Sequence, residues 1–158
     1  MYTNDHKCCM VFKLNFVVLL VMNIQQSDSD KERTHVTNQK PSKILIIDDN
    51  ESMTKLLARF FEMKNIQHTI SNDGLTGLQL INEKKFDTIL LDLAMPDFSG
   101  WDVIETLEKQ GNLKEERILV FTASTLSPLQ MEELLKRGIK GYVKKPVKLK
   151  TLLQVLGA

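Results

Sequence analysis

Five polar residues follow or end apolar, strand-like runs of this sequence, and they are Asp48, Asp49, Asp92, Thr122 and Lys145. They comprise three carboxylates, one hydroxyl and one ammonium. If the apolar runs are strands of one parallel sheet, their carboxyl ends meet at a single edge, which is where such sheets bind ligands. The side chains would then share one small pocket, and their chemistry suits a phosphoryl group together with a divalent cation.

Three carboxylates in one pocket repel one another strongly. At about 4 Å and an effective dielectric constant near 20, each like-charged pair costs roughly 4 kcal/mol. A pocket of this composition therefore requires a cation, a protonated carboxyl group, or both. A structural role gives little reason to collect three acids, although a single aspartate could simply cap a helix or begin a loop.

The residue types suggest a role for each side chain. Asp92 is the candidate nucleophile, because a carboxylate can accept a phosphoryl group and form an acyl phosphate. Asp48 and Asp49 are candidate ligands of Mg2+, which prefers octahedral oxygen ligation. Lys145 offers a compact positive charge for the phosphoryl oxygens, and Thr122 offers a hydroxyl donor. For Thr122 alone, an ordinary β-branched residue at a strand end is the competing interpretation.

The elements that must position these residues alternate between strand and helix patterns, which indicates a doubly wound α/β domain. The expected strands are 43–48, 66–71, 88–92, 117–122 and 141–144. The helix patterns between them are expected to begin after the capping residues Asn50, Asp73, Ser99 and Ser127. A last helix is expected to place inward the residues Leu149, Leu152, Leu153 and Leu156.

Apolar spacing predicts which face of each earlier helix is buried. The first helix is expected to turn inward Met53, Leu56, Leu57, Phe60 and Phe61. The second is expected to turn inward Leu75, Leu78 and Ile81, and the third Val103, Ile104 and Leu107.

The fourth helix carries the clearest signals for its two ends. Ser127 and Gln130 form a predicted capping box, with Pro128 at the first helical position. Gly138 is placed to end the helix in a left-handed conformation, which lets Ile139 fold back onto the last turn.

Four short motifs occur in order along the chain, separated by intervals long enough for a helix. They are residues 46–50 (Ile-Ile-Asp-Asp-Asn), 91–100 (Leu-Asp-Leu-Ala-Met-Pro-Asp-Phe-Ser-Gly), 121–123 (Phe-Thr-Ala) and 142–146 (Tyr-Val-Lys-Lys-Pro). In this arrangement the chain from Lys43 to its last residue resembles the receiver domain of two-component response regulators. Each motif alone is weak, but the four together are specific. The resemblance implies a flavodoxin-like fold, with a five-stranded parallel sheet of strand order 2-1-3-4-5 and five helices.

The resemblance also implies how the metal and the phosphoryl group are held. Asp92 would be the phosphoacceptor in a Mg2+-dependent reaction. Asp49 and Asp92 would bind the metal directly, Asp48 would bind it through water, and the backbone carbonyl of Ala94 would complete the set. Lys145, rather than its neighbour Lys144, matches the conserved position before proline in the family.

Three further features follow from the same resemblance. The Ala123 N–H would join Thr122 in binding the phosphoryl oxygens. Thr122 and Tyr142 would act together as the switch, although Tyr142 alone could be an ordinary half-buried strand tyrosine. Pro146 would follow a cis peptide bond.

The implied function is that of a phosphorylated signalling switch rather than an enzyme. The donor would be a histidine kinase or a phosphotransfer protein. The sequence ends shortly after the last helix, so a stand-alone switch or phosphorelay intermediate without an attached output domain is expected. Its output surface would lie around residues 127–153, where basic residues are frequent, and would meet an unidentified protein or a second copy in a phosphorylation-dependent dimer.

Two alternatives compete with this interpretation. A metal-dependent phosphohydrolase with an aspartate nucleophile, of the haloacid-dehalogenase type, would carry a second acid two residues after the nucleophile, where this chain has Ala94. A degenerate receiver that acts only as a binding module would lack one of the acids or the lysine, and none is missing here.

Residues 1–42 differ in composition from the rest. The run 10–24 is apolar at 12 of 15 positions, which is shorter than the about 20 residues that a transmembrane helix needs. No small-x-small cleavage site follows it. Residues 25–42 are polar without apolar periodicity and are expected to be a flexible linker. We therefore interpret residues 1–42 as a non-globular extension, with a signal peptide or membrane anchor as the alternative.

Charge and cysteine usage bound the function further. From Lys43 onward the chain has 16 basic and 16 acidic residues, so it lacks the basic footprint of a nucleic-acid-binding domain. The only two cysteines, Cys8 and Cys9, are adjacent and precede the domain. No disulfide can form within the domain, which suits a reducing compartment such as the cytoplasm.

Overall fold

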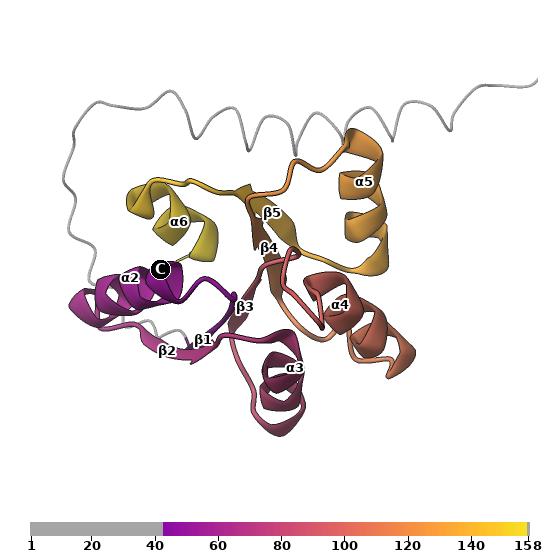
Figure 1. The fold of residues 1–158 in the computed structure, drawn as a ribbon, viewed down its shortest axis with the longest axis horizontal. Helices are drawn as coiled ribbons and strands as arrows, with labels where there is room; N and C mark the ends of the chain where they lie inside the picture. The colour runs from indigo at the N-terminus through magenta and orange to yellow at the C-terminus, as the bar shows by residue number, and fades with distance from the viewer. Residues whose placement is uncertain (1–42, 158) are drawn as a thin grey trace, which may run out of the picture. The chain divides into compact units, whose positions relative to one another are not determined.

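Strands and helices alternate along the part of the chain that the computed structural model describes, residues 43–157 (Figure 1). In chain order they are β1 (Lys43–Ile47), α2 (Glu51–Met63), β2 (Gln67–Ser71), α3 (Gly74–Glu83), β3 (Thr88–Leu91), α4 (Gly100–Lys109), β4 (Ile118–Thr122), α5 (Pro128–Arg137), β5 (Gly141–Lys144) and α6 (Leu149–Leu156). The five strands form one parallel sheet in the order β2-β1-β3-β4-β5. The expected fold class and strand order are therefore confirmed.

The sheet is covered by helices on both faces, as its continuous apolar strands require. Alternate residues of β1 point to opposite sides: Leu45 and Ile47 pack in the core beneath α3, α4 and α5, whereas Ile44 and Ile46 pack beneath α2 and α6. In Figure 1, α2 and α6 accordingly lie together on one side of the sheet, and α3, α4 and α5 lie on the other. Every residue of β1, β3 and β4 except Lys43 is buried. The three central strands are therefore covered by side chains on both faces of the sheet.

Side-chain caps begin four of the helices, as the sequence predicts. Asn50, Asp73, Ser99 and Ser127 each accept a hydrogen bond from a backbone N–H in the first turn of the helix that follows. Such caps satisfy N–H groups that have no partner within the helix. The residue at which each of these four helices begins is therefore set by local hydrogen bonds.

The end of α5 also follows the prediction. Gly138 has φ +123°, and its N–H donates to Leu135 O, while the N–H of Ile139 donates to Leu134 O at 3.1 Å. This is the Schellman pattern of hydrogen bonds. Ile139 is buried in the same core as Leu134, so the chain turns directly from α5 into β5.

Two residues that were predicted to face inward are exposed, so those predictions are wrong. Leu56 in α2 is 52% exposed and Leu75 in α3 is 53% exposed. In α3 the buried face runs through Gly74, Gly77 and Leu78 to Ile81, and the two glycines carry no apolar side chain to reveal it. Leu56 lies one position before the buried Leu57, and one helical step of about 100° is enough to turn it outward.

The predictions for residues 1–42, including the apolar run 10–24, the linker 25–42 and the cysteines, lie outside the described residues. Within residues 43–157, none of the helices has both the length and the apolar character that crossing a membrane would require.

Candidate functional site

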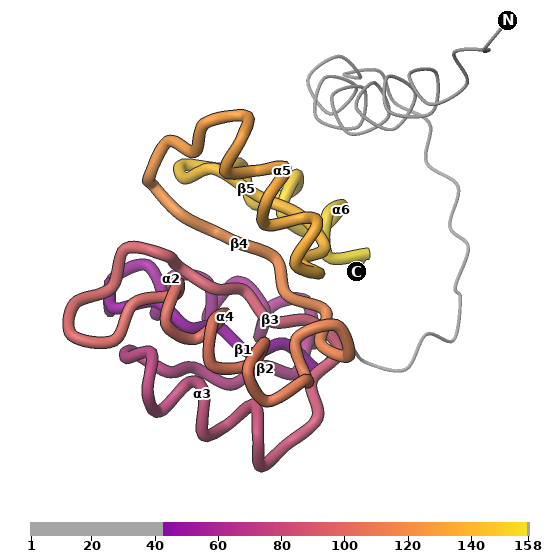
Figure 2. The backbone as a smooth tube through the Cα atoms, turned by 90° about the vertical axis from the view of Figure 1, so that its right-hand side faces the viewer, coloured from indigo at the N-terminus to yellow at the C-terminus, as the bar shows by residue number. Residues whose placement is uncertain are grey.

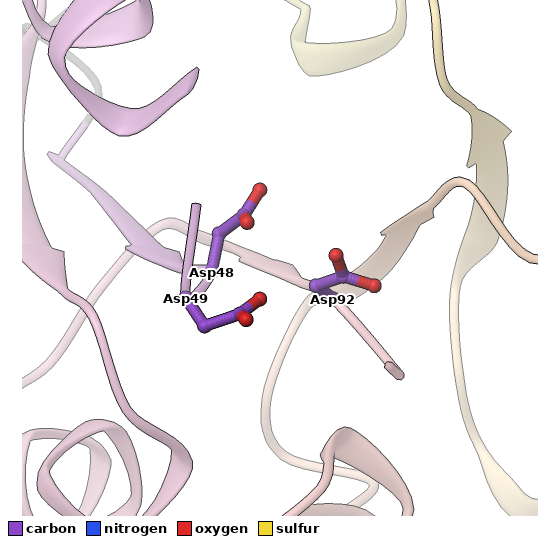
Figure 3. Close-up of side chains that lie close together, drawn as sticks. All are labelled: Asp48, Asp49 and Asp92. Carbon is purple, nitrogen blue, oxygen red and sulfur yellow. The ribbon is translucent and has the colours of Figure 1, made fainter. Parts of the chain in front are cut away.

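The carboxyl ends of β1 and β3 bring the three aspartates together. These strands are neighbours, and Ile47 is paired with Leu91. The next residues, Asp48 and Asp92, therefore leave the sheet side by side, with Asp49 immediately after Asp48 (Figure 3). One carboxylate oxygen from each of the three aspartates lies within 4.8 Å of the other two. Asp48 and Asp92 are buried, whereas Asp49 is exposed.

Lys145 supplies a positive charge between the two buried acids. Its Nζ lies 2.5 Å from Oδ2 of Asp48 and 2.6 Å from Oδ2 of Asp92. The three side chains are only 9%, 1% and 8% exposed, so these are charge-assisted hydrogen bonds shielded from water. The Lys145 N–H donates to Thr122 O at 2.9 Å, and the Lys145–Pro146 peptide bond is cis, as the family resemblance implies.

The loop after β1 is held by hydrogen bonds to Asp48. The N–H of Asn50 donates to Oδ1 of Asp48 at 3.0 Å. Nδ2 of Asn72 donates both to the backbone oxygen of Asp48, at 2.8 Å, and to the hydroxyl of Thr54, at 3.0 Å. Asn72 was not predicted as a supporting residue. Its position directly after the end of β2 is the only sequence signal that could have revealed it.

The loop after β3 is held from two directions. The N–H of Ala94 donates to Oδ1 of Asp92 at 3.0 Å, which leaves Oδ2 facing Lys145. Gly100, the first residue of α4, packs directly on the backbone of this loop: a Cβ atom there would lie 2.1 Å from Asp92 O and 2.8 Å from the Cα of Leu93. Only glycine permits this approach, and α4 thereby fixes the backbone that carries Asp92.

The two buried aspartates differ in their acidity. Burial raises the pKa of Asp48 above its ordinary value, although hydrogen bonds from Lys145 and from the Asn50 N–H act in the opposite direction. Burial acts in the same sense on Asp92, but Lys145, the Thr122 hydroxyl and the Ala94 N–H together outweigh it and lower the pKa of Asp92. Asp92 is therefore the more readily ionised of the two, as a nucleophile should be.

Thr122 and Tyr142 are linked through Ser124. Thr122 is fully buried at the end of β4, and its Oγ1 accepts a hydrogen bond from the Ser124 N–H at 3.2 Å. The hydroxyl of Tyr142 donates to Ser124 O at 3.3 Å, and burial raises the pKa of Tyr142. Ala123, between Thr122 and Ser124, is exposed. The two predicted switch residues thus contact the same short loop.

The donor set fits a hard divalent cation. It consists of carboxylate oxygens that converge on one point, and Mg2+ and Ca2+ both prefer such ligands. In addition, Lys145 neutralises only part of the charge of three ionised acids. The backbone oxygen of Ala94 and the division between direct and water-mediated ligands remain predictions.

Comparison with known proteins identifies relatives of the domain. A family model for the response regulator receiver domain matches residues 44–157. Chemotaxis protein CheY-3 of Vibrio cholerae is 32% identical over 120 residues, which cover 74% of this chain and 90% of that protein. The solved structure of V. cholerae CheY4 has a TM-score of 0.66 and 27% identity, covering 75% of this chain and 98% of that one.

A second solved structure is relevant to the chemistry. A response regulator protein from Burkholderia pseudomallei was solved with a phosphorylated aspartic acid, a calcium ion and citrate. It is 28% identical to this chain, with a TM-score of 0.63, and the match covers 73% of this chain and 66% of that protein.

Replacing Lys145 with methionine should destabilise the metal-free protein at neutral pH. The change leaves Asp48 and Asp92 buried without their counter-charge, and breaking a buried ion pair in this way costs about 3 kcal/mol. The measurement is the free energy of unfolding in denaturant with a chelator present. Lys144→Met is the matched control, because Lys144 is exposed and its ammonium donates to the hydroxyl of Thr125 rather than to an acid.

The loss in free energy of unfolding caused by Lys145→Met should also become smaller as the pH falls from 7 toward 4. Burial already raises the pKa of Asp48 above its ordinary value, and loss of Lys145 raises it further. A group whose pKa is higher in the folded state stabilises the fold as it gains its proton. If Lys145→Met is as stable as Lys144→Met at pH 7, Lys145 does not neutralise this pocket.

Proposed function

Because the chain belongs to the family of response regulator receiver domains, we propose that Asp92 accepts a phosphoryl group from a histidine kinase or a phosphotransfer protein. Phosphoryl acceptance on an aspartate is general to this family. The observation that carries the assignment to Asp92 is the contact of its Oδ2 with the Lys145 ammonium at 2.6 Å, in a pocket that also contains two further carboxylates.

The chemistry is a transfer between two nucleophiles. An oxygen of Asp92 forms a bond to phosphorus while the bond from phosphorus to the donor's histidine nitrogen breaks, and that nitrogen keeps the electron pair. Such transfers depend mainly on positioning and on neutralising the charge of the phosphoryl oxygens. Lys145 contributes a positive charge at this point, and the lowered pKa of Asp92 keeps the nucleophile ionised. The Thr122 hydroxyl and the Ala123 N–H are the proposed donors to the remaining phosphoryl oxygens.

We assign a Mg2+ site to the same pocket. Asp48, Asp49 and Asp92 would hold the ion, together with the backbone carbonyl of Ala94. When bound, Mg2+ would neutralise the charge that gathers on the transferring group. The convergence of three carboxylates within 4.8 Å supports this assignment. So does the B. pseudomallei relative, whose structure contains a phosphorylated aspartic acid and a calcium ion.

The alternatives have less support. A haloacid-dehalogenase-type phosphohydrolase needs an acid at the position of Ala94, and here that residue contributes its N–H to Asp92 instead. A receiver that has lost its chemistry would lack an acid or the lysine, yet all four side chains are present in one pocket. Family members are signalling switches, and we propose this role, in the cytoplasm, rather than an enzymatic one.

We place the output surface on α5, β5 and α6. These elements gather at one edge of the sheet (Figure 2). Their exposed basic residues include Lys136, Lys144 and Lys150, and Leu129 is 78% exposed. The proposed partners are an acidic protein surface, a phosphotransfer domain that takes the phosphoryl group onward, or a second copy of this chain.

Acetyl phosphate and Mg2+ should phosphorylate the protein at Asp92. Intact-mass measurement is expected to show the addition of one phosphoryl group to the wild type and none to Asp92→Asn. Asp97→Asn is the matched control, because Asp97 is an exposed acid of the same loop and asparagine tolerates its φ of +59°. Equal labelling of the Asp92→Asn protein and the wild type would place the phosphoacceptor elsewhere.

Asp49→Ala should weaken Mg2+ binding at least about tenfold, or roughly 1.4 kcal/mol, and leave the fold intact because it relieves repulsion among the acids. The readout is the fluorescence of Trp101, the only tryptophan of the chain, which lies in the first turn of α4 beside the Asp92 loop. Glu105→Ala, which removes an exposed acid from the same helix, should bind Mg2+ as the wild type does. An unchanged affinity in Asp49→Ala would mean that the cation binds at another place.

A phosphate mimic such as beryllofluoride should change the chemical shifts of Tyr142 and α5 as well as those of the site loops. A phosphorylated aspartate carries nearly two added negative charges, and a shift of Thr122 toward them would loosen the Ser124 loop that Tyr142 contacts. Useful coupling requires only about 1–3 kcal/mol. Thr122→Ala should confine the changes to the site loops, whereas Thr125→Ala should not. If beryllofluoride does not change the chemical shifts of Tyr142 in the wild type, the protein lacks this switch and only carries the phosphoryl group.

A further inference from the structure

The ammonium of Lys145 contacts an aromatic ring in addition to the two carboxylates. Its Nζ lies 4.9 Å from the centroid of the Phe121 ring, within the range of a cation–π interaction. Phe121 is the residue of β4 immediately before Thr122 and is only 2% exposed. It is paired with Val143 of β5, two residues before Lys145. The sequence identified Phe121 only as an apolar strand residue.

The ring matters for the position of the Lys145 ammonium, because the Asp48 and Asp92 carboxylates are not available to Lys145 alone. Asp48 and Asp92 belong to the group of acids that fits a divalent cation. A cation bound there would compete with the ammonium for Asp48 and would repel it. The Phe121 ring carries no net charge and takes no part in binding the ion, so its attraction for the ammonium persists.

We propose that Phe121 is a positioning residue for phosphoryl transfer, whose ring face holds the Lys145 ammonium beside Asp92. This inference rests on the proposed function of Asp92. It assigns the ring a role beyond filling the core beneath α2 and α6. A leucine could fill much of the same volume, but it lacks the negative face of an aromatic ring that attracts a cation.

The first experiment tests the contact itself by NMR on the metal-free protein. Protons above an aromatic ring face are shifted upfield, so the ε-CH2 and ammonium protons of Lys145 should carry such a shift in the wild type. Phe121→Leu should remove it. Phe61→Leu is the matched control, because Phe61 is equally buried in the same core and has its aromatic contacts with Phe60 and His68. Unchanged Lys145 shifts in Phe121→Leu would overturn the proposal without any reference to phosphorylation.

The second experiment separates electrostatics from packing. Site-specific incorporation of 3,4,5-trifluorophenylalanine at position 121 nearly keeps the shape of the ring but withdraws its electron density. The rate of phosphorylation by saturating acetyl phosphate should fall about 3- to 10-fold, the range expected for loss of one cation–π contact. The Mg2+ dissociation constant should stay at the wild-type value, and the protein should remain folded at the assay temperature. The same substitution at position 61 should leave the rate unchanged.

The outcomes separate this inference from the proposed function. If trifluorophenylalanine at 121 reacts as fast as the wild type, the ring only fills space and the inference is wrong. If the wild type is not phosphorylated on Asp92, the proposed function is wrong, and the Lys145 chemical shifts then decide alone whether the ring holds the ammonium. Should Phe121→Leu fail to fold, the phosphorylation rate of the fluorinated protein decides the matter, because that substitution keeps the ring and its packing.

Discussion

Repulsion among Asp48, Asp49 and Asp92 is the constraint on which the rest of this structure depends. Like charges this close cost several kcal/mol per pair, and a fold that brings them together must supply compensation. Here the compensation comes from Lys145, whose ammonium bridges the two buried acids. Because one ammonium cannot neutralise three carboxylates, the pocket keeps an affinity for further positive charge. The same imbalance makes it suitable for a divalent cation and for the transfer of an anionic group.

The fold meets this constraint by holding the acids on short loops fixed from several sides. Pairing of β1 with β3 sets Asp48 beside Asp92. Asn72 holds the first loop from the end of β2, and Gly100 holds the second by packing α4 directly onto its backbone. The strands beneath are fully enclosed by two apolar cores. The charge repulsion therefore has little freedom to relax by movement of the backbone, and it is relieved instead through Lys145. Burial raises the pKa of Asp48 in addition.

The route from this pocket to the proposed output surface is short. Thr122 at the end of β4 and Tyr142 in β5 both bond to Ser124, whose loop leads into α5. The far end of α5 is fixed, because Arg137 donates twice to Glu108 of α4 and the helix ends in a Schellman pattern. Its beginning is held by the local capping box of Ser127 and Gln130. Helix α5 is thus anchored at its far end. Its beginning adjoins the Ser124 loop, through which a change of charge at Asp92 would act on the helix.

The sequence by itself determined the alternation of strands and helices, the helix caps, the end of α5 and the set of chemical groups in the pocket, because these depend on local spacing and residue type. The strand order came from the family resemblance and was confirmed. Only the tertiary structure decided the contacts made across the fold: Lys145 meets Asp48 and Asp92 from 97 and 53 residues away, Asn72 holds Asp48, and the Phe121 ring lies under the ammonium. It also decided that Leu56 and Leu75 face outward. Periodicity reports which side of a helix is apolar, but which residue is covered depends on where neighbouring elements pack, and glycines at a close contact leave no apolar signal.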